Sequence, residues 1–190
     1  MRRISFWHLA FWLSTGALVT TASGCGDPLG QKATLESVVD TVTLFALRGT
    51  PIRSPSAYNM LSLSVTQTQT SSDFDFAFDI SPEGRPLAYP RGALGLSTGP
   101  GLQLTDQTFD AVHRAPDTGF KTDSGLTLAL DNVFLARSRT SSVYCLYVAV
   151  PRYGKFHVLA IDTTARSITL EALVDLNCGY HSLEPGIPGS

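Results

Sequence analysis

Charged residues make up only 16% of this 190-residue chain, and the two signs nearly cancel, leaving a formal net charge of −2. This small, balanced charge excludes a nucleic-acid binder that works by massed lysine and arginine. It also argues against intrinsic disorder, because 43% of the residues are apolar and disordered chains combine low hydrophobicity with high net charge. The length suits one folded domain with a sizeable core.

Signatures of catalysis and of ligand binding are also missing. No Gly-x-Ser-x-Gly segment provides a nucleophile elbow, and the glycines between positions 84 and 101 do not open a helix as a phosphate-binding loop would. The histidines after residue 25, which are His113, His157 and His181, lack the spacing of metal ligands. We therefore expect no catalytic residue, no metal and no cofactor, and we find neither an internal repeat nor a domain linker.

The first 24 residues have the order of a secretory signal. Arg2 and Arg3 come first, and an apolar stretch over residues 4–19 follows, interrupted at positions such as His8 and Gly16. A membrane-spanning helix needs about 20 largely apolar residues. The shorter, broken stretch therefore favours a signal peptide over residues 1–24 that is cleaved, rather than a permanent membrane anchor.

The signal ends in Ala22-Ser23-Gly24-Cys25. This segment resembles the lipobox of bacterial lipoproteins, in which small residues precede a cysteine that is acylated when the signal is cut off. It departs from that pattern at Ala22, where the family usually has leucine, so ordinary signal-peptidase cleavage near Cys25 is the competing interpretation. We expect lipidation of Cys25, a flexible tether over residues 25–32 and a domain over residues 33–190. The resemblance implies the bacterial cell envelope and leaves inner or outer membrane open.

Cleavage before Cys25 would change the composition of the chain. The remaining 166 residues (190 − 24) contain no tryptophan, because Trp7 and Trp12 both lie in the signal. Loss of Arg2 and Arg3 makes the net charge −4, with 12 basic and 16 acidic residues. A mildly acidic domain gains nothing from anionic lipid, so attachment to the membrane would depend on the acyl chains.

Threonine and serine alternate with apolar residues along the rest of the chain, a pattern that favours strands over helices. The clearest strand covers residues 73–80, where an aromatic face alternates with a face that carries Asp73, Asp75 and Asp79. In a half-buried strand the aromatic face would be buried and the acidic face would be wet. Residues 81–84 then predict a turn.

Further strands are expected over residues 37–47, 85–89, 108–112, 126–130 and 133–137, with an edge or loop at 60–70 and short strands within 93–104. Residues 33–40 could instead begin a short helix. The C-terminal third predicts strong strands at 143–150, 156–162 and 167–176, with turns at 151–154 and 163–166 and an irregular tail from Gly179. In the last strand, Leu173 and Asp175 fall on the outward face. Together these patterns predict an all-β fold, a single antiparallel β-sandwich or barrel.

If Cys25 carries lipid, Cys145 and Cys178 remain as an even pair in an oxidising compartment, and we expect a disulfide between them. The simplest register argues against it. A flat three-stranded meander would place the two cysteines about 30 Å apart, whereas a bonded pair needs its Cα atoms within about 7 Å. Either the chain folds back after Leu176, or the three strands are not one flat meander, or both thiols are free.

Two groups of charged residues are weaker candidates. The three aspartates of residues 73–80 could bind calcium, which takes several oxygen ligands, but a solvated strand face that discourages aggregation is the favoured interpretation. Residues 137–139 with Arg152 and Lys155 could form a small basic patch, and there too a solvated surface is favoured.

The C-terminal segment 174–188, Val-Asp-Leu-Asn-Cys-Gly-Tyr-His-Ser-Leu-Glu-Pro-Gly-Ile-Pro, resembles the C-terminal signature of a group of uncharacterised bacterial lipoproteins. The Asp-rich strand followed by Gly84-Arg85 and the lipobox are also similar to theirs. The resemblance implies an envelope lipoprotein with a β-rich domain. It brings no known activity, so no functional residue is carried over.

Two classes of function remain open. The first is a non-enzymatic module that binds a protein or glycan partner or scaffolds the envelope, with no nucleic-acid partner. The second is an envelope-tethered hydrolase or carbohydrate-binding protein that uses His113, His181 or the aspartates. The second requires one of these histidines within hydrogen-bond reach of a serine or an aspartate in a pocket.

Overall fold

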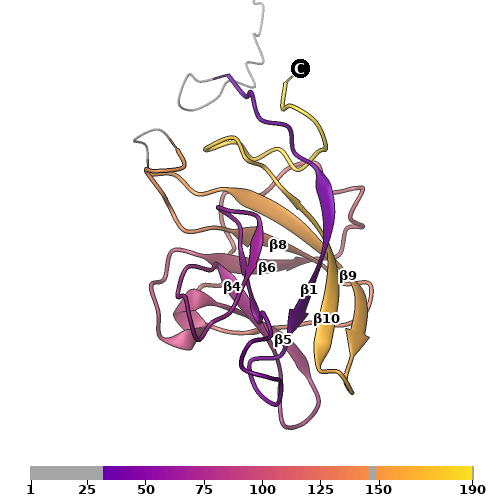
Figure 1. The fold of residues 1–190 in the computed structure, drawn as a ribbon. Coiled ribbons are helices and arrows are strands. Elements are labelled where there is room, and N and C mark those ends of the chain that lie inside the picture. The colour runs from indigo at the N-terminus through magenta and orange to yellow at the C-terminus, as the bar shows by residue number, and fades with distance from the viewer. Residues whose placement is uncertain (1–31, 146–148, 190) are drawn as a thin grey trace, which may run out of the picture.

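The computed structural model describes residues 32–145 and 149–189, so the predicted signal and Cys25 lie outside the described residues (Figure 1). The strands form two antiparallel sheets of five strands each, packed face to face as a sandwich. In order across the first sheet lie β1 (Val39–Phe45), β10 (Ser167–Val174), β9 (Tyr153–Asp162), β8 (Val133–Arg137) and β6 (Gly101–Thr105). The second sheet contains β3 (Ser64–Thr66), β2 (Ala57–Asn59), β4 (Phe76–Ile80), β5 (Pro86–Pro90) and β7 (Leu126–Thr127). A short 3₁₀ helix, η1 (Arg91–Leu94), follows β5.

The space between the sheets is filled by apolar side chains from both. Phe76 of β4 packs against Phe134 of β8 and Phe156 of β9, and the ring centroids lie 5.1 to 5.7 Å apart. Aromatic pairs at this spacing contribute beyond the burial of their area. The aromatic face predicted for residues 73–80 is therefore confirmed as the centre of the core, and the predicted turn at 81–84 joins β4 to β5 in a hairpin.

The outer face of the first sheet is also covered, which the alternation of β10 did not indicate. Leu173, predicted to face outward, is fully buried there. It packs in a second apolar cluster with Phe109 and Val112 from the segment after β6 and Leu183 from the C-terminal tail. We call residues 106–125 and 175–189 the cover layer. Around Leu173 this layer buries the outer face, so there the first sheet is apolar on both sides. Elsewhere that face carries exposed polar residues such as Thr41 and Thr43.

Three predicted elements are wrong. Residues 108–112 form turns in the cover layer, and Val143–Cys145 lie in a turn rather than a strand. Residues 151–154 are not a turn, because β9 already begins at Tyr153. The reason is that β9 pairs with β8 and not with the segment directly before it. In addition, residues 33–40 form no helix: Ser37 makes a β-bridge with Gly186 and β1 begins at Val39.

Cys145 and Cys178 form the predicted disulfide, and their Cα atoms lie 5.4 Å apart. The argument against this disulfide assumed that the last three predicted strands form a flat meander, and that assumption is wrong. The register of Ala160 opposite Thr169 is correct, but Cys145 does not lie opposite Ala160, because it belongs to a loop outside the sheet. After β10 the chain turns, and Tyr180 N donates to the carbonyl of Asn177. Both cysteines therefore reach the same end of the sandwich.

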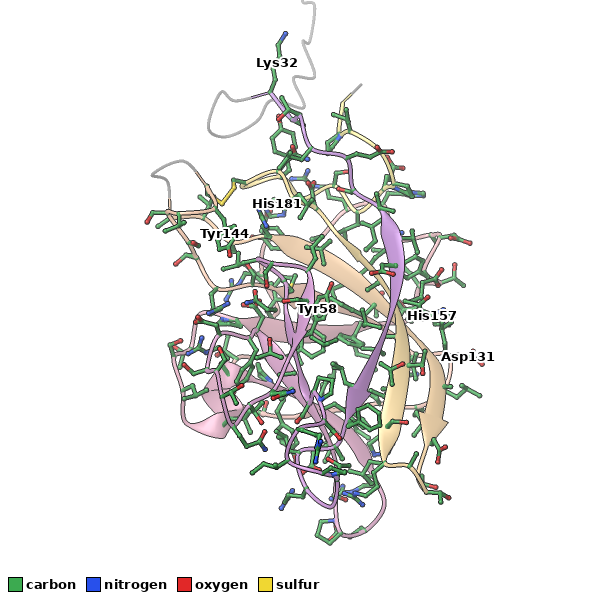
Figure 2. The ribbon with its side chains drawn as sticks, in the orientation of Figure 1. Lys32, Tyr58, Asp131, Tyr144, His157 and His181 are labelled. Atoms are coloured by element: carbon green, nitrogen blue, oxygen red, sulfur yellow. A yellow bond between two sulfur atoms is a disulfide. The ribbon has the colours of Figure 1, made fainter. Side chains whose placement is uncertain are left out.

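The described chain begins at that same end (Figure 2). The backbone N–H of Ala33 donates to the hydroxyl of Tyr180 at 3.0 Å, and the N–H groups of Thr34 and Leu35 each donate to Asn177 Oδ1 at 2.9 Å. Asn177 Nδ2 donates back to the carbonyl of Leu35. These bonds fix the chain to the C-terminal segment from Ala33 onward.

Candidate functional site

Two of the three aspartates predicted on a wet face are buried. Asp75, just before β4, and Asp79, within it, are each 1% exposed. Their strand face is covered because Ala77, between them, packs against a cluster that includes Leu47 and Leu94. A solvated face that discourages aggregation is therefore the wrong interpretation of this row.

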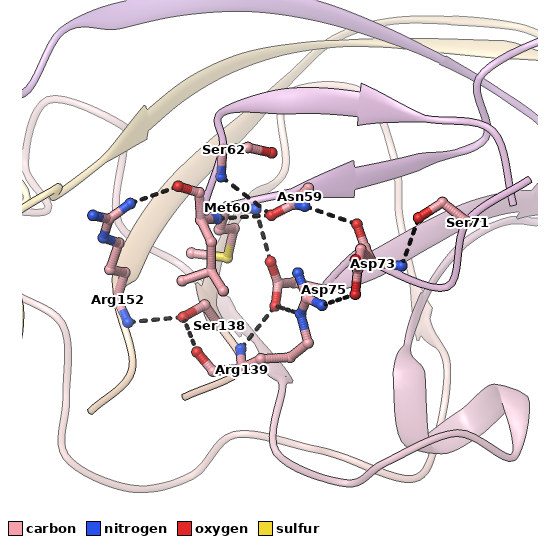
Figure 3. Close-up of polar contacts among 10 residues, drawn as sticks. Asn59, Met60, Ser62, Ser71, Asp73, Asp75, Ser138, Arg139 and Arg152 are labelled. Atoms are coloured by element: carbon pink, nitrogen blue, oxygen red, sulfur yellow. Dashed lines mark hydrogen bonds and ion pairs between the residues drawn. The ribbon is translucent and has the colours of Figure 1, made fainter. Parts of the chain in front are cut away.

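Asp75 is the centre of a hydrogen-bond network that ties the two sheets together (Figure 3). Its Oδ2 accepts from the N–H of Met60 at 2.7 Å, and its Oδ1 accepts from the N–H and Nε of Arg139 at 2.7 and 3.2 Å. Arg139 also donates to Asp73, at 2.8 Å. Burial raises the pKa of Asp75, although the hydrogen bonds and positive charge of Arg139 oppose this rise. The carboxylate thus serves the fold, and its oxygens are directed at protein donors instead of a cation.

Asp79 serves two other arginines at the opposite end of β4. Arg48 Nε lies 2.7 Å from Asp79 Oδ2, and an Arg166 nitrogen lies 3.6 Å from Asp79 Oδ1. Within residues 32–145 and 149–189, no three His, Cys, Asp or Glu side chains are arranged to hold a metal ion.

The solvated surface favoured for Arg152 and Lys155 is the wrong interpretation, and the alternative basic patch does not form either, because both side chains are buried. Arg152 is 4% exposed and donates to the carbonyl of Leu61 at 2.7 Å. Lys155 is 3% exposed, and its Nζ donates to the carbonyls of Phe109 and Val112 at 2.7 and 3.1 Å. Lys155 therefore holds the cover layer against β9. Burial lowers the pKa of its ammonium group.

Each of the three histidines in the described residues lies within 4 Å of a carboxylate. His113 Nδ1 lies 2.9 Å from Glu184 Oε1. His157 lies between Glu171, at 3.2 Å, and Asp131, at 3.7 Å. His-carboxylate pairs orient an imidazole, which is one requirement of acid–base catalysis.

His181 makes a contact of a different kind. Its ring stacks on Tyr153 with centroids 4.0 Å apart, and its Nδ1 lies 3.1 Å from the carbonyl of Ala115 and 3.5 Å from Asp117. The ring therefore connects the tail to β9 and to residues 115–117, and packing explains its position.

The pair of His113 and Glu184 lines a cavity of about 350 Å³, together with Lys155 and Glu171. Both members of the pair are more than half exposed, and no serine, threonine or cysteine side chain lines the cavity with them. The cavity thus supplies an oriented base and a buried amine without an adjacent hydroxyl or thiol nucleophile.

A cleft of about 790 Å³ lies over the outer face of β6 and β8. Gln103 and Leu135, which pair across the two strands, form its floor with Thr105. One wall is the cover-layer segment 112–117, which includes Arg114. The buried Oε1 atom of Gln103 has no hydrogen-bond partner among the described residues. No sequence pattern pointed to this cleft, because it depends on the pairing of β6 with β8.

Sequence reasoning also missed a third buried acid. Asp175, predicted to face outward, is fully buried, and its Oδ1 accepts from the N–H and Nδ2 of Asn177. Its Oδ2 and the Nε of buried Arg152 lack partners among the described residues. Burial raises the pKa of Asp175, while the hydrogen bonds from Asn177 and the charge of Arg152 oppose this effect.

Comparison of the sequence with models of known protein families and with curated proteins gave no match. In the described residues, no helix is both long enough and apolar enough to span a membrane.

Proposed function

We propose that the protein is a lipid-anchored lipoprotein of the bacterial cell envelope and that its β-sandwich is a non-enzymatic binding module. The anchor is supported by the order of the first 25 residues: two arginines, a short apolar stretch, and small residues directly before Cys25. The proposed tether, residues 25–32, would end just before Ala33, where hydrogen bonds begin to hold the chain to the domain.

The cleft over β6 and β8 is the observation that carries the binding function. Its lining mixes an amide, a hydroxyl, both signs of charge and the apolar Leu135. Gln103 on the floor of the cleft has its Oε1 buried without a partner, which is costly, and a shift of this side chain toward a ligand donor would relieve that cost. This chemistry suits a polar ligand, either a glycan or a segment of an envelope protein, held by hydrogen bonds without a reaction.

The anchor is tested by mass spectrometry of the protein purified from bacterial membranes. We expect an N-terminal peptide that begins at Cys25 and carries acyl chains. The Cys25→Ser variant should appear in the soluble fraction. An N-terminus away from Cys25, or an unmodified Cys25, would contradict the anchor.

The binding function is tested by cross-linking in intact envelopes. A photoactivatable amino acid at Arg114, on the wall of the cleft, should give discrete cross-linked species. The matched control is the same group at Arg85, which is 65% exposed and lies outside the cleft. Digestion of the products with a protease or a glycosidase identifies the ligand class. Equal cross-linking from both positions would contradict a binding role for the cleft.

An envelope-tethered hydrolase is the second candidate, and the pair of His113 and Glu184 beside Lys155 is the observation that favours it. A hydrolase that used this pair would lose roughly 10²-fold or more of its rate when His113 is changed to Gln. Screening the purified protein against ester, peptide and glycoside substrates, with H113Q as the control, separates the two functions. We expect no turnover that depends on His113.

A further inference from the structure

Exposed apolar side chains gather at the end of the sandwich where the described chain begins. They are Leu35 (46% exposed), Val38 (65%), Val143 (85%), Tyr144 (49%) and Ile187 (40%). We call these five residues the apolar end. An exposed group of this kind indicates an interaction surface rather than ordinary scatter.

Several contacts place these residues together. Leu35 and Tyr144 line one small hollow beside the disulfide. The antiparallel bridge between Ser37 and Gly186 brings the segment that carries Val38 alongside the tail segment that carries Ile187. The ribbon shows the chain start, the C-terminus and the loop after β8 at this same end (Figure 1).

The opposite end of the sandwich has fewer exposed apolar side chains in its turns. The loop after β1, the β4–β5 turn and the β9–β10 turn meet there around a hollow lined by Arg48 and Arg166. Of the large apolar side chains that are exposed in the described residues, Ile52 alone belongs to these turns, and it is 71% exposed. The two ends therefore differ in apolar surface.

The tether decides which end can reach a membrane. Seven residues lie between Cys25 and Ala33, which makes eight Cα–Cα steps (33 − 25), and an extended chain of that length spans at most about 29 Å. A domain of this size is about 40 Å across. If the far end touched the bilayer, Ala33 would stand about 40 Å above it, beyond the reach of the tether.

We propose that the apolar end rests in the interface of the membrane that holds Cys25, so that the domain has a fixed orientation with the arginine-rich turns pointing away. The inference rests on the proposed lipid anchor. Acyl chains and an inserted apolar surface are two membrane signals, and together they anchor more firmly than either one. Tyr144 suits this position, because aromatic rings with a polar tip favour the headgroup level. Lys32 and Glu36 beside it offset each other in charge, so the contact does not need anionic lipid.

The absence of tryptophan after Trp12 makes the test specific. Val143→Trp and the matched control Ile52→Trp each introduce a single tryptophan at an exposed apolar position, one at either end of the sandwich. The acylated full-length mature protein of each variant is reconstituted in phosphatidylcholine vesicles, with and without brominated acyl chains. We expect V143W emission to shift to the blue and to be quenched several-fold by bromine, while I52W emission stays as it is in buffer. Addition of anionic lipid should change neither result.

Three outcomes would overturn the inference. If Cys25 is acylated and the protein binds vesicles, but V143W is quenched no more than I52W, the orientation is wrong and the anchor stands. If Cys25 is not acylated, the proposed function fails and the inference fails with it. If V143W emission shifts to the blue without vesicles and in proportion to protein concentration, a second copy of the chain covers the apolar end instead.

Discussion

Replacement of Asp75 by Asn tests whether the buried network in Figure 3 holds the two sheets together. The amide has nearly the same shape as the carboxylate, so the change leaves no cavity. It does alter the hydrogen bonding: Met60 N and Arg139 N each donate to a different oxygen of Asp75. Whichever way the amide is turned, its NH₂ group faces one of these donors, and Arg139 loses its buried counter-charge.

The expected loss follows from these contacts. Removing one partner of a buried ion pair costs about 3 to 5 kcal/mol, and Asn keeps one acceptor, so we expect Asp75→Asn to lower the free energy of unfolding by about 3 kcal/mol. Asp73→Asn is the matched control. It removes the other carboxylate that Arg139 contacts, but Asp73 is 76% exposed, so its loss should be about 0 to 1 kcal/mol.

Urea unfolding of the mature protein at pH 7, followed by far-UV circular dichroism, measures both values. At the slope usual for small domains, the midpoint of Asp75→Asn should fall by about 1 to 3 M with the slope unchanged. The reasoning is refuted if the two variants lose the same free energy, or if Asp75→Asn loses less than about 1 kcal/mol.

Three further predictions concern other features. The double variant Cys145→Ser/Cys178→Ser should lose about 3 to 4 kcal/mol of unfolding free energy, because the bond closes a loop whose ends are 33 residues apart; an unchanged urea midpoint would contradict this. For Asp175, the folded-state pKa is raised above its ordinary value of 3.8, so its stabilising contribution is present below that value and is lost as the pH rises through the folded pKa. The urea midpoint of Asp175→Asn, relative to the natural protein, should therefore rise as the pH increases above about 4. If the two midpoints change with pH in the same way, this prediction is wrong. Emission of the membrane-extracted protein should come from tyrosine alone, because cleavage removes Trp7 and Trp12; tryptophan emission would show that the signal is retained.

The strands that sequence reasoning found are those with local alternation and flanking turns. Residues 133–137 form β8 within the predicted bounds, and the turn at 163–166 joins β9 to β10 as expected. The failures have one cause, since pairing between distant strands is not encoded in local periodicity. Apolar residues at 108–112 and 143–145 resemble strands, but 108–112 supplies a cover layer and 143–145 a loop. Their burial depends on what the rest of the chain places beside them.

The same limit applies to the candidate site residues. The disulfide followed from counting cysteines, whereas its geometry could not be derived without knowing that β8 is the neighbour of β9. A polar residue at every second position predicts a wet face only when nothing covers that face. On β4 that face is covered by the segment after β1 and also by η1. Arg48 and Arg139 neutralise the aspartates. No pattern within residues 73–80 contains that information.

Charged residues are few in this chain, and several of them hold the fold together, which limits the variants that can be used to locate its function. Arg139, Arg152, Lys155 and Arg166 bond to buried carboxylates or to backbone carbonyls of distant segments, so these cations act as ties within the fold. Because a buried polar group depends on its hydrogen-bond partners, changing one of these four cations will lower the stability of the fold. That loss would obscure any effect on binding. Variants meant to find a partner should therefore come from the cleft and the apolar end. Val143 is suitable because its side chain is 85% exposed. A change there alters the surface and leaves the hydrogen bonds and ion pairs of the buried cations intact.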